Sequence, residues 1–473
     1  MKVEQLYTNC LAHGAYYIES NGEAAIIDPL REIQEYIEMA ESRGAKIKYI
    51  FETHFHADFV SGHKDLAEAT GATIVYGPTT METGYDIHVG KDDEIFILGK
   101  SKIRLLHTPG HTTESSCYLL INEEGKEEAI FTGDTLFIGD VGRPDLAQKV
   151  IAELTETKLA KMLYSSLRDK IMPLNDEIIV YPGHGAGSAC GKNMSKETSD
   201  TLGNQKKSNY ALRADMSEDE FIKELLDGLT PPPAYFPQNV LMNIKGYESI
   251  NEVLKRGTSA LSIVEFENLA KQDDVIIVDT RHQNDFVNGF IPGSVFIGIK
   301  GNFATWVGTV IKDVNQKIVF IADEGSEEEV ATRFARVGFD NLLGYLDGSF
   351  KTWNESGKEV ASIPSISVKE FSERAAKGKV DIIDARKESE YNSHHVVDAK
   401  NIPLDYLEPN EVIVDNPENT FVHCAGGYRS VIFLSLLAKV GKTGITNVEG
   451  GFSSIEKENK LELTEYVCPT TLL

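Results

Sequence analysis

The amino-acid sequence predicts an α/β protein built from three successive domains. Its 473 residues are enough for three domains at about 150 residues each. Short apolar runs typical of strands alternate with segments of helical spacing, and one such pattern occurs twice in the second half of the chain. We place the boundaries so that the domains are residues 1–256, 257–362 and 363–473.

The mixed order of strands and helices predicts a layered fold for the first domain. Helical spacing is clearest in residues 32–43 and 158–167, and a run of three prolines at 231–233 begins a connecting region. Strands are expected at residues 16–19, 24–27, 47–51, 94–98, 103–106, 116–121, 129–131 and 177–181.

The second and third domains are predicted to be copies of each other. Asp279 and Asp384 each end a strand-like run and are 105 positions apart, and Phe290 and His395 keep the same spacing. An offset this constant indicates a duplicated domain of about a hundred residues. Each copy alternates strand and helix patterns, which predicts a parallel sheet with helices on both faces.

Composition narrows the function classes. The chain has 47 basic and 73 acidic side chains, a net charge of −26, which argues against nucleic-acid binding and against docking on an anionic membrane. No apolar window is long enough to span a bilayer, and the first residues lack the pattern of a signal peptide. The five cysteines are scattered and form no CxxC pair, so we expect a cytoplasmic protein with reduced thiols.

A group of histidines and acids follows the predicted strands of the first domain. Each follows a predicted strand, three of them directly after a glycine, and strand ends can converge on one edge of a sheet. Nitrogen and oxygen ligands without thiolate suit Zn, Fe(II) or Mn. Spacing alone leaves open whether His54 or His56 is the ligand. The group consists of His54, His56 and Asp58 in THFHAD, His111 in PGH, Asp134 in TGD and His184 in PGH.

This combination of motifs resembles the metallo-β-lactamase superfamily over about the first 250 residues, which implies an αββα sandwich. Dinuclear hydrolases of that superfamily carry a further histidine directly after Asp58, where this chain has Phe59. A phenyl ring cannot bind a metal, so a mononuclear centre is favoured. Two histidines and one carboxylate form the ligand set of non-haem Fe(II) oxygenases.

The segment Gly142-Arg143-Pro144-Asp145 resembles the GRxD segment of persulfide dioxygenases. That resemblance implies one Fe(II) per chain in the first domain, with His54, His111 and Asp134 as ligands. It leaves the remaining site residues to orient ligands and waters or to contact substrate: His56, Asp58, His184, Arg143 and Cys190. For Cys190 a small buried apolar role and a thiol close to the metal are both open, and Lys192 is a candidate to attract an anionic group.

The third domain contains a cysteine between a strand and a helix, in the loop Cys424-Ala425-Gly426-Gly427-Tyr428-Arg429-Ser430. Unpaired backbone N–H groups at a helix start stabilise a thiolate, and Arg429 adds positive charge. Cysteine phosphatases place five residues between Cys and Arg, whereas four lie between them here. The smaller loop suits a sulfur atom better than a phosphate.

The same loop resembles the active loop of rhodanese-type sulfurtransferases. This implies that Cys424 is the nucleophile, that Arg429 and the loop amides around Gly427 hold an anion, and that Ser430 supports the loop. The equivalent loop of the middle copy reads Ala322-Asp323-Glu324-Gly325 and has no cysteine, with acid in place of the arginine. We therefore expect the middle copy to be an inactive spacer or docking module.

Taken together, the three domains resemble persulfide dioxygenase–rhodanese fusion proteins. The resemblance implies oxidation of a low-molecular-weight persulfide by O₂ to sulfite, and sulfane-sulfur transfer through Cys424 to or from sulfite and thiosulfate. The expected partners are these small molecules and further copies of the chain in a homo-oligomer. The alternatives are a zinc-dependent thioester hydrolase of the glyoxalase II type fused to a sulfurtransferase, and a sulfur carrier without turnover. Intact Cys424 and a complete metal triad disfavour the carrier.

Overall fold

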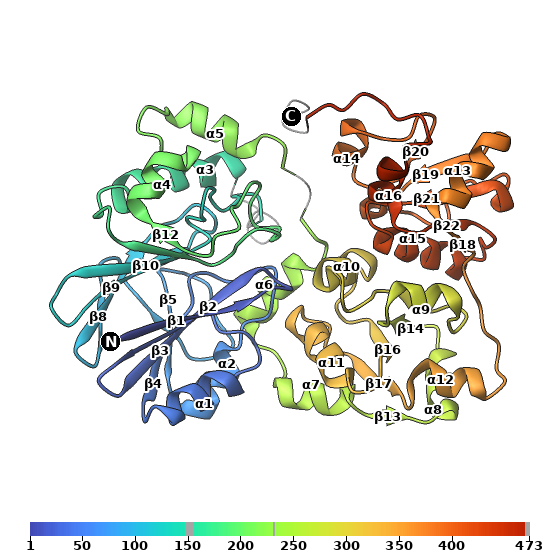
Figure 1. The fold of residues 1–473 in the computed structure, drawn as a ribbon. Coiled ribbons are helices and arrows are strands. Elements are labelled where there is room, and N and C mark those ends of the chain that lie inside the picture. The colour runs from blue at the N-terminus through green and yellow to red at the C-terminus, as the bar shows by residue number, and fades with distance from the viewer. Residues whose placement is uncertain (147–154, 230–231, 469–473) are drawn as a thin grey trace. The chain divides into compact units, whose positions relative to one another are not determined.

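The computed structural model describes residues 1–146, 155–229 and 232–468, and these divide into two compact units (Figure 1). The first unit comprises Met1–Glu252 together with two short later segments, Lys312–Val314 and Phe334–Asp340. The second unit holds the rest, which is the third domain and most of the middle copy of the predicted repeat. The division predicted at residues 256 and 362 stays a prediction, since the compact units follow contacts rather than domains.

Two six-stranded sheets form the centre of the first unit. In the first sheet β1, β2 and β3 are antiparallel and β3 to β6 are parallel; in the second sheet only β10 and β11 are parallel. The first sheet has the order β1 (Lys2–Thr8), β2 (His13–Ser20), β3 (Glu23–Ile27), β4 (Lys46–Phe51), β5 (Thr73–Tyr76) and β6 (His88–Val89). The second has the order β12 (Asp200–Thr201), β11 (Ile179–Pro182), β10 (Glu127–Gly133), β9 (Ser116–Ile121), β8 (Ser101–His107) and β7 (Ile95–Leu98).

The two sheets pack face to face, and helices cover their outer faces (Figure 1). Phe51 of the first sheet and Tyr118 of the second belong to one buried apolar cluster between the sheets. Separate clusters join α1, α2 and α6 to the first sheet and α3 and α5 to the second. The predicted αββα sandwich is confirmed. Its helices are α1 (Gln34–Ser42), α2 (His63–Thr70), α3 (Glu156–Ser166), α4 (Leu202–Ser208), α5 (Glu218–Leu226) and α6 (Phe236–Lys245).

The region after the proline run is more than a connection. Residue 231 lies outside the described residues, but from Phe236 the chain forms α6, whose Ile244 joins the cluster on the first sheet. Pro237 in the first turn suits a helix start, because the missing N–H has no partner there in any helix. The proline run correctly indicated a break in regular structure, but it did not indicate that the chain then packs against the first sheet again.

A buried ion pair holds the segment Phe334–Asp340 in the first unit. Arg31 has 0% of its surface exposed, and its two terminal nitrogens lie 2.6 and 2.8 Å from the carboxylate oxygens of Asp340. The same guanidinium donates hydrogen bonds to the carbonyls of Ala335 and Glu248. Nearby, the amide of Val60 donates to the carbonyl of Arg336 at 2.8 Å. Residues about 300 positions apart in the sequence therefore complete one unit.

The second unit contains two five-stranded sheets of the same design. All strand pairs in both are parallel, as the sequence predicts. The third sheet has the order β13 (Ala260–Leu261), β17 (Leu342–Leu346), β16 (Lys317–Ile321), β14 (Val275–Asp279) and β15 (Val295–Phe296). The fourth has the order β18 (Ser365–Ile366), β22 (Thr446–Val448), β21 (Thr420–His423), β19 (Asp381–Asp384) and β20 (Lys400–Asn401).

The helices of the second unit repeat as well. Ser262 caps α8 and Ser367 caps α13, each with a glutamate three residues later that bonds back to the cap. The two caps are 105 positions apart, the same offset as the predicted repeat. The chain enters through α7 (Ile250–Gly257), and the remaining helices are α8 (Ile263–Ala270), α9 (Gln283–Asn288), α10 (Phe303–Val310), α11 (Glu327–Arg336), α12 (Ser349–Glu355), α13 (Val368–Lys377), α14 (Glu388–Ser393), α15 (Tyr428–Lys439) and α16 (Gly451–Glu458).

Among the described residues, no helix combines the length and apolar character that crossing a bilayer requires.

Candidate metal centre and cysteine loop

The three predicted metal ligands lie together where strands of the first unit end. His54 follows β4, His111 follows β8, and Asp134 directly follows β10. Their possible ligand atoms all lie within 4.8 Å of one another, and all three side chains are buried. Nε2 of His111 is 3.5 Å from Oδ2 of Asp134, and the rings of His54 and His111 have centroids 4.9 Å apart. The arrangement can hold one metal ion.

Hydrogen bonds fix which nitrogen each imidazole offers. The Thr53 hydroxyl donates to Asp28 at 2.8 Å, so it must accept the hydrogen bond from Nδ1 of His54 at 2.9 Å. Nδ1 of His111 donates to the carbonyl of Arg143 at 2.8 Å. In both rings Nε2 then carries the lone pair, and such a partner on the other nitrogen is typical of metal-binding histidines.

The protonation preferences of the triad also suit a cation. Burial and the neighbouring His56 lower the pKa of His54 well below its usual value, and burial lowers the pKa of His111 to about 4. Both rings are therefore neutral near pH 7. Burial and the nearby Asp58 carboxylate raise the pKa of Asp134 well above its usual value, and neither of its oxygens has a hydrogen-bond partner among the described residues. A bound divalent ion would satisfy that buried carboxylate.

A glycine allows the approach of strand β10 to this centre. Gly133 has φ of +48°, and a Cβ added to it would lie 2.4 Å from the hydroxyl oxygen of Thr53. Any side chain would therefore separate Asp134 from the Thr53–His54 segment.

The histidine that spacing could not separate from His54 faces another way. Nε2 of His56 lies 3.1 Å from Oδ1 of Asp28 and 3.4 Å from Oε2 of Glu52. Burial alone would lower the pKa of His56, but these two carboxylates raise it well above its usual value. His56 thus faces two carboxylates, and His54 is the ring that joins His111 and Asp134.

A second possible ligand group lies beside the first. His184 Nε2 is 3.4 Å from Oδ2 of Asp58 and 3.5 Å from Oδ1 of Asp134, and His56 completes a group whose ligand atoms lie within 4.8 Å of one another. Phe59 is fully buried, with its ring 4.4 Å from the rings of His13 and His56. An apolar ring therefore fills space beside this second group.

Cys190 lies close to the metal triad. Its thiol falls within 4.8 Å of ligand atoms of Asp134 and His184, and the residue is only 1% exposed. Burial, together with the Asp58 and Asp134 carboxylates, raises the pKa of this thiol well above its usual value. The burial fits a small apolar residue and the distances fit a thiol beside a metal site, so both interpretations left by the sequence stay open.

Two basic residues suggested by the sequence have protein partners. The guanidinium of Arg143 donates two hydrogen bonds to the carboxylate of Asp145, at 2.7 and 2.6 Å, so the arginine and the aspartate of the GRxD segment pair with each other. The backbone carbonyl of Arg143 orients His111. The amine of Lys192 donates to the carbonyls of Glu224 and Asp227. Its amine thus joins the loop after His184 to the C-terminal end of α5.

A cavity adjoins His111, and its lining was not anticipated. Its walls include Phe55, which lies between His54 and His56 in the THFHAD motif, and Ala57, which follows His56. The alternation of polar and apolar residues in this motif is the one sequence signal that could have indicated these two wall residues. The other lining residues are Met81, Thr112, Thr113, Glu114, Leu146, Val240 and Ile244, from segments far apart in the chain.

In the second unit, Cys424 lies where β21 ends and α15 is about to begin. The amide of Gly427 donates to the sulfur of Cys424 at 3.1 Å, and Gly427 has φ of +95°, a left-handed conformation that glycine adopts easily. The Ser430 hydroxyl donates to Asn447 on β22 at 2.8 Å, and both side chains are buried. The loop therefore curls around the sulfur and is tied to the sheet below it.

Arg429 is already engaged in an ion pair. Its two terminal nitrogens donate to the two carboxylate oxygens of Glu390 at 2.6 and 2.8 Å. This partner on α14 was not anticipated, and no sequence pattern connects the two residues. An anion at the loop would share Arg429 with that carboxylate.

The middle copy has the same loop position but different chemistry. β16 ends at Ile321, and the loop that follows leads into α11, whose first turn contains Glu327, Glu328 and Glu329. By contrast, the Asp-x-Arg segment is the same in both copies. Arg281 pairs with Asp279, and Arg386 pairs with Asp384, with closest distances of 2.6 Å in each. That segment is structural in both.

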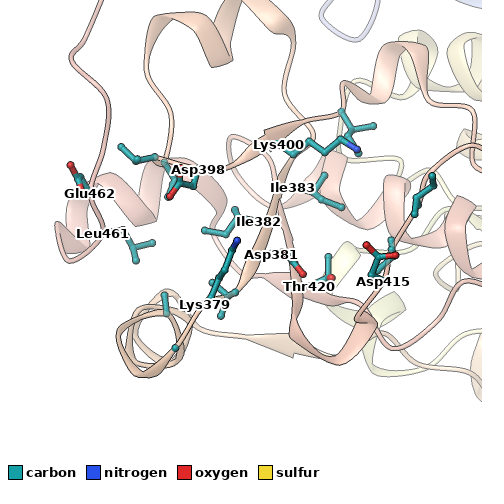
Figure 2. A pocket seen from close by; sticks show the side chains of 18 residues that line it. Lys379, Asp381, Ile382, Ile383, Asp398, Lys400, Asp415, Thr420, Leu461 and Glu462 are labelled. Carbon is teal, nitrogen blue, oxygen red and sulfur yellow. The ribbon is translucent and has the colours of Figure 1, made fainter.

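A cavity of about 680 Å³ lies at the opposite end of the fourth sheet from Cys424. The first residues of β19 and β21, Asp381 and Thr420, line it, whereas Cys424 follows the last residue of β21. Figure 2 shows lysines and carboxylates around this cavity, among them Lys379, Lys400 and Asp415. The mixture of charges gives no preference for an anion, and the cavity is separate from the cysteine loop.

Comparison with known proteins agrees with this architecture. The family described as metallo-beta-lactamase superfamily matches residues 9–184, and the rhodanese-like domain matches residues 262–356 and 367–458. A cytoplasmic hydroxyacylglutathione hydrolase of Arabidopsis thaliana is 32% identical over 179 residues, which are 37% of this chain and 65% of that protein. A hydroxyacylglutathione hydrolase of Pelagibacter ubique is 33% identical over 180 residues, 37% of this chain and 68% of that protein.

The chain thus covers only about two thirds of the length of these relatives. Among solved structures, a metallo-beta-lactamase from Staphylococcus aureus subsp. aureus COL is 30% identical with a TM-score of 0.63. That match covers 73% of this chain and 98% of the other. The chain belongs to the metallo-β-lactamase superfamily, and two rhodanese-like domains follow its metallo-β-lactamase domain.

Proposed function

We propose that this protein oxidises a low-molecular-weight thiol persulfide to sulfite in its first unit and transfers sulfane sulfur through Cys424 in its second. The observation that carries the proposal is the buried triad of two neutral histidines and one carboxylate, His54, His111 and Asp134. This is the ligand set of mononuclear Fe(II) oxygenases. Its presence in one chain with a cysteine-containing rhodanese-like domain supports a sulfur substrate.

The overall oxidation is RSSH + O₂ + H₂O → RSH + SO₃²⁻ + 2 H⁺. One Fe(II) held by the triad would supply open coordination positions and the electron-transfer chemistry that O₂ requires. The protein residues hold and orient: Thr53 and the Arg143 carbonyl fix the two imidazoles, and the buried surroundings exclude bulk water. The nearness of the Cys190 thiol to Asp134 and His184 supports a contact with the sulfur substrate.

The transfer step needs no external oxidant. The Cys424 thiolate attacks the outer sulfur of RSSH, the S–S bond of the substrate breaks, RSH leaves with the proton, and Cys424 becomes a persulfide anion. Sulfite then attacks the outer sulfur of that persulfide, which releases thiosulfate and restores the Cys424 thiolate. The Gly427 amide is positioned to stabilise negative charge on the cysteine sulfur, and Arg429 lies next in the loop to receive the anion.

The test is O₂ uptake by the iron-loaded protein with glutathione, coenzyme A and bacillithiol persulfides, with sulfite and thiosulfate measured together. Asp134→Ala is expected to abolish O₂ uptake and sulfite but to leave persulfide formation on Cys424. Cys424→Ala is expected to keep sulfite formation and lose thiosulfate, and Cys468→Ser, at an exposed cysteine, serves as the control. Absence of O₂ uptake with every persulfide would contradict the dioxygenase activity.

A thioester hydrolase is the second candidate function. The hydroxyacylglutathione hydrolases among the relatives favour it, and so does the second ligand group of His56, Asp58 and His184. The apolar ring of Phe59 beside this group counts against a second metal ion. Metal analysis separates the two: two zinc ions per chain with hydrolysis of a glutathione thioester would support the hydrolase, and one iron per chain would support the dioxygenase.

The expected homo-oligomer is also a proposal, and light scattering of the purified protein tests it.

A further inference from the structure

A tyrosine of the cysteine loop is anchored in the middle, cysteine-free copy. The hydroxyl of Tyr428 donates a hydrogen bond to the carbonyl of Gly298 at 2.7 Å. Its ring lies 5.4 Å from the ring of Phe296 in an edge-on arrangement. Both partners belong to β15 and the segment that follows it, residues 295–301, which we call the anchor segment.

The anchor segment is held on both sides. One helical face of α15 contacts it twice, because Ser435 lies seven residues after Tyr428 and accepts a hydrogen bond from the amide of Phe296 at 3.1 Å. From within the middle copy, Arg333 donates to the carbonyl of Ile299 at 2.7 Å. The segment is therefore a fixed surface against which Tyr428 rests.

A glycine in the anchor segment has the shape that Tyr428 requires. A Cβ added to Gly301 would lie 2.3 Å from the Tyr428 ring, closer than real Cβ contacts come. Gly301 does not have a left-handed backbone conformation, so the space taken by the tyrosine ring is what excludes a side chain there. The two copies are thus complementary at this contact.

Tyr428 lies between the two residues of the loop that act on the Cys424 sulfur, so its contact with the anchor segment affects their positions. Tyr428 follows Gly427, whose amide donates to the sulfur of Cys424, and it precedes Arg429. A shift of the tyrosine would move both the amide donor and the guanidinium relative to the sulfur. At an active site, displacements of about 1 Å can cost large factors in rate.

We propose that Tyr428 is a positioning residue for sulfur transfer, and that the middle copy acts as a support that holds the cysteine loop in its reactive shape. The inference rests on the sulfur-transfer role proposed for Cys424. It gives the middle copy a function that needs no cysteine of its own, since only the backbone carbonyl of Gly298, the ring of Phe296 and the bare Cα of Gly301 are used.

The experiment compares sulfur transfer from thiosulfate to cyanide in the full chain carrying Tyr428→Phe, Tyr428→Leu or Gly301→Ala. Active sites are counted by the mass increase of Cys424 on persulfide formation, so that a partly unfolded sample does not lower the rate per site. Tyr428→Phe removes one hydrogen bond and keeps the ring, and we expect kcat to fall about fivefold. Tyr428→Leu and Gly301→Ala should each lower kcat by about tenfold or more, with smaller changes in KM.

Matched controls are Tyr345→Phe, at a partly exposed tyrosine of the middle copy, and Gly378→Ala, where an added Cβ has open space. Both should leave kcat unchanged. The double variant Tyr428→Leu with Gly301→Ala should be no slower than the worse single variant, because both remove the same contact.

If kcat per active site is unchanged in all three variants while the unsubstituted protein transfers sulfur, the positioning role is overturned. Additive losses in the double variant would overturn it as well. If the unsubstituted protein forms no persulfide on Cys424, the proposed function of the second unit fails instead, and O₂ uptake by the first unit reports separately on that unit.

Discussion

Thr53 shows how much of the metal centre depends on a residue that touches no metal. Its hydroxyl joins Asp28 to the ring of His54, and its side chain leaves just enough space for Gly133. The sequence placed candidate ligands after predicted strands but left His54 and His56 equivalent, and only the family resemblance implied His54, His111 and Asp134. The orientation of each ring depends on partners such as Thr53, which a single sequence does not distinguish from any other threonine.

Thr53→Val keeps the volume of the side chain and removes the acceptor for Nδ1 of His54. We expect the affinity for Fe(II) to fall about 10- to 100-fold, as is usual when such a partner of a metal-binding histidine is lost. Competition with a coloured chelator measures it. Thr73→Val, at an exposed position of β5, is the control, and equal affinities for both variants would refute the role of Thr53.

Glu390→Gln removes the carboxylate that pairs with Arg429 and frees the guanidinium charge for an anion. We expect the KM for thiosulfate to fall about threefold to tenfold, because one negative charge near the anion is removed. Steady-state kinetics measure it, with Glu388→Gln on the exposed side of the same helix as control. A higher KM would show that Glu390 orients Arg429 instead of competing with the anion.

At the scale of elements, helix α6 holds the segment between β4 and α2, which contains the THFHAD motif. Asn243 on α6 is fully buried, and its amide donates to the carbonyls of His56 and Phe59 and accepts from the amide of Ser61. These three bonds hold the turn between the ligand His54 and α2. Nothing in the sequence indicated them, because an asparagine in an amphipathic helix usually faces water.

Asn243→Asp has the same shape but lacks the two donors. The carbonyls of His56 and Phe59 would then face a carboxylate, so we expect the free energy of unfolding to fall by about 2 kcal/mol or more and Fe(II) affinity to fall with it. Urea unfolding and metal titration check both. The control is Asn9→Asp, at an exposed position of the same unit, and it should change neither property. An Asn243→Asp protein that is as stable as the unsubstituted protein and binds metal normally would contradict this role of Asn243.

The elements that the sequence predicted best are those with a local signal. The strand ends carrying metal ligands, the loop before α15 and the 105-residue repeat all follow from short-range patterns. The contacts that it missed join segments far apart: Asn243 with His56, Tyr428 with Gly298, and Arg31 with Asp340. Such contacts involve single polar residues with no periodicity, and a single sequence read by itself contains no record of them.

At the scale of the whole molecule, the ion pair of Arg31 and Asp340 joins two parts of the first unit that are 309 positions apart in the chain. Removing one partner of a buried pair leaves an uncompensated charge, which is far more costly than losing an exposed pair. The sequence-based division at residue 256 would therefore separate Arg31 from its partner.

Asp340→Asn is expected to destabilise the first unit by about 3 to 5 kcal/mol, because Arg31 stays fully buried. Urea unfolding, followed by the loss of metal binding by the first unit, measures this change in stability. Asp215→Asn breaks the exposed pair with Arg213 and should have no measurable effect. The double variant Arg31→Met with Asp340→Leu should recover much of the loss, and failure of Asp340→Asn to destabilise would contradict this role of the pair.

The same pair sets an order of events during synthesis. When residue 256 leaves the ribosome, the guanidinium of Arg31 has no carboxylate to meet, and the chain must grow by 84 residues before Asp340 exists. At about 5 to 20 residues per second this takes about 4 to 17 seconds. During that interval the first unit lacks a segment that belongs to its compact fold, so its folding is completed only after most of the middle copy has been translated.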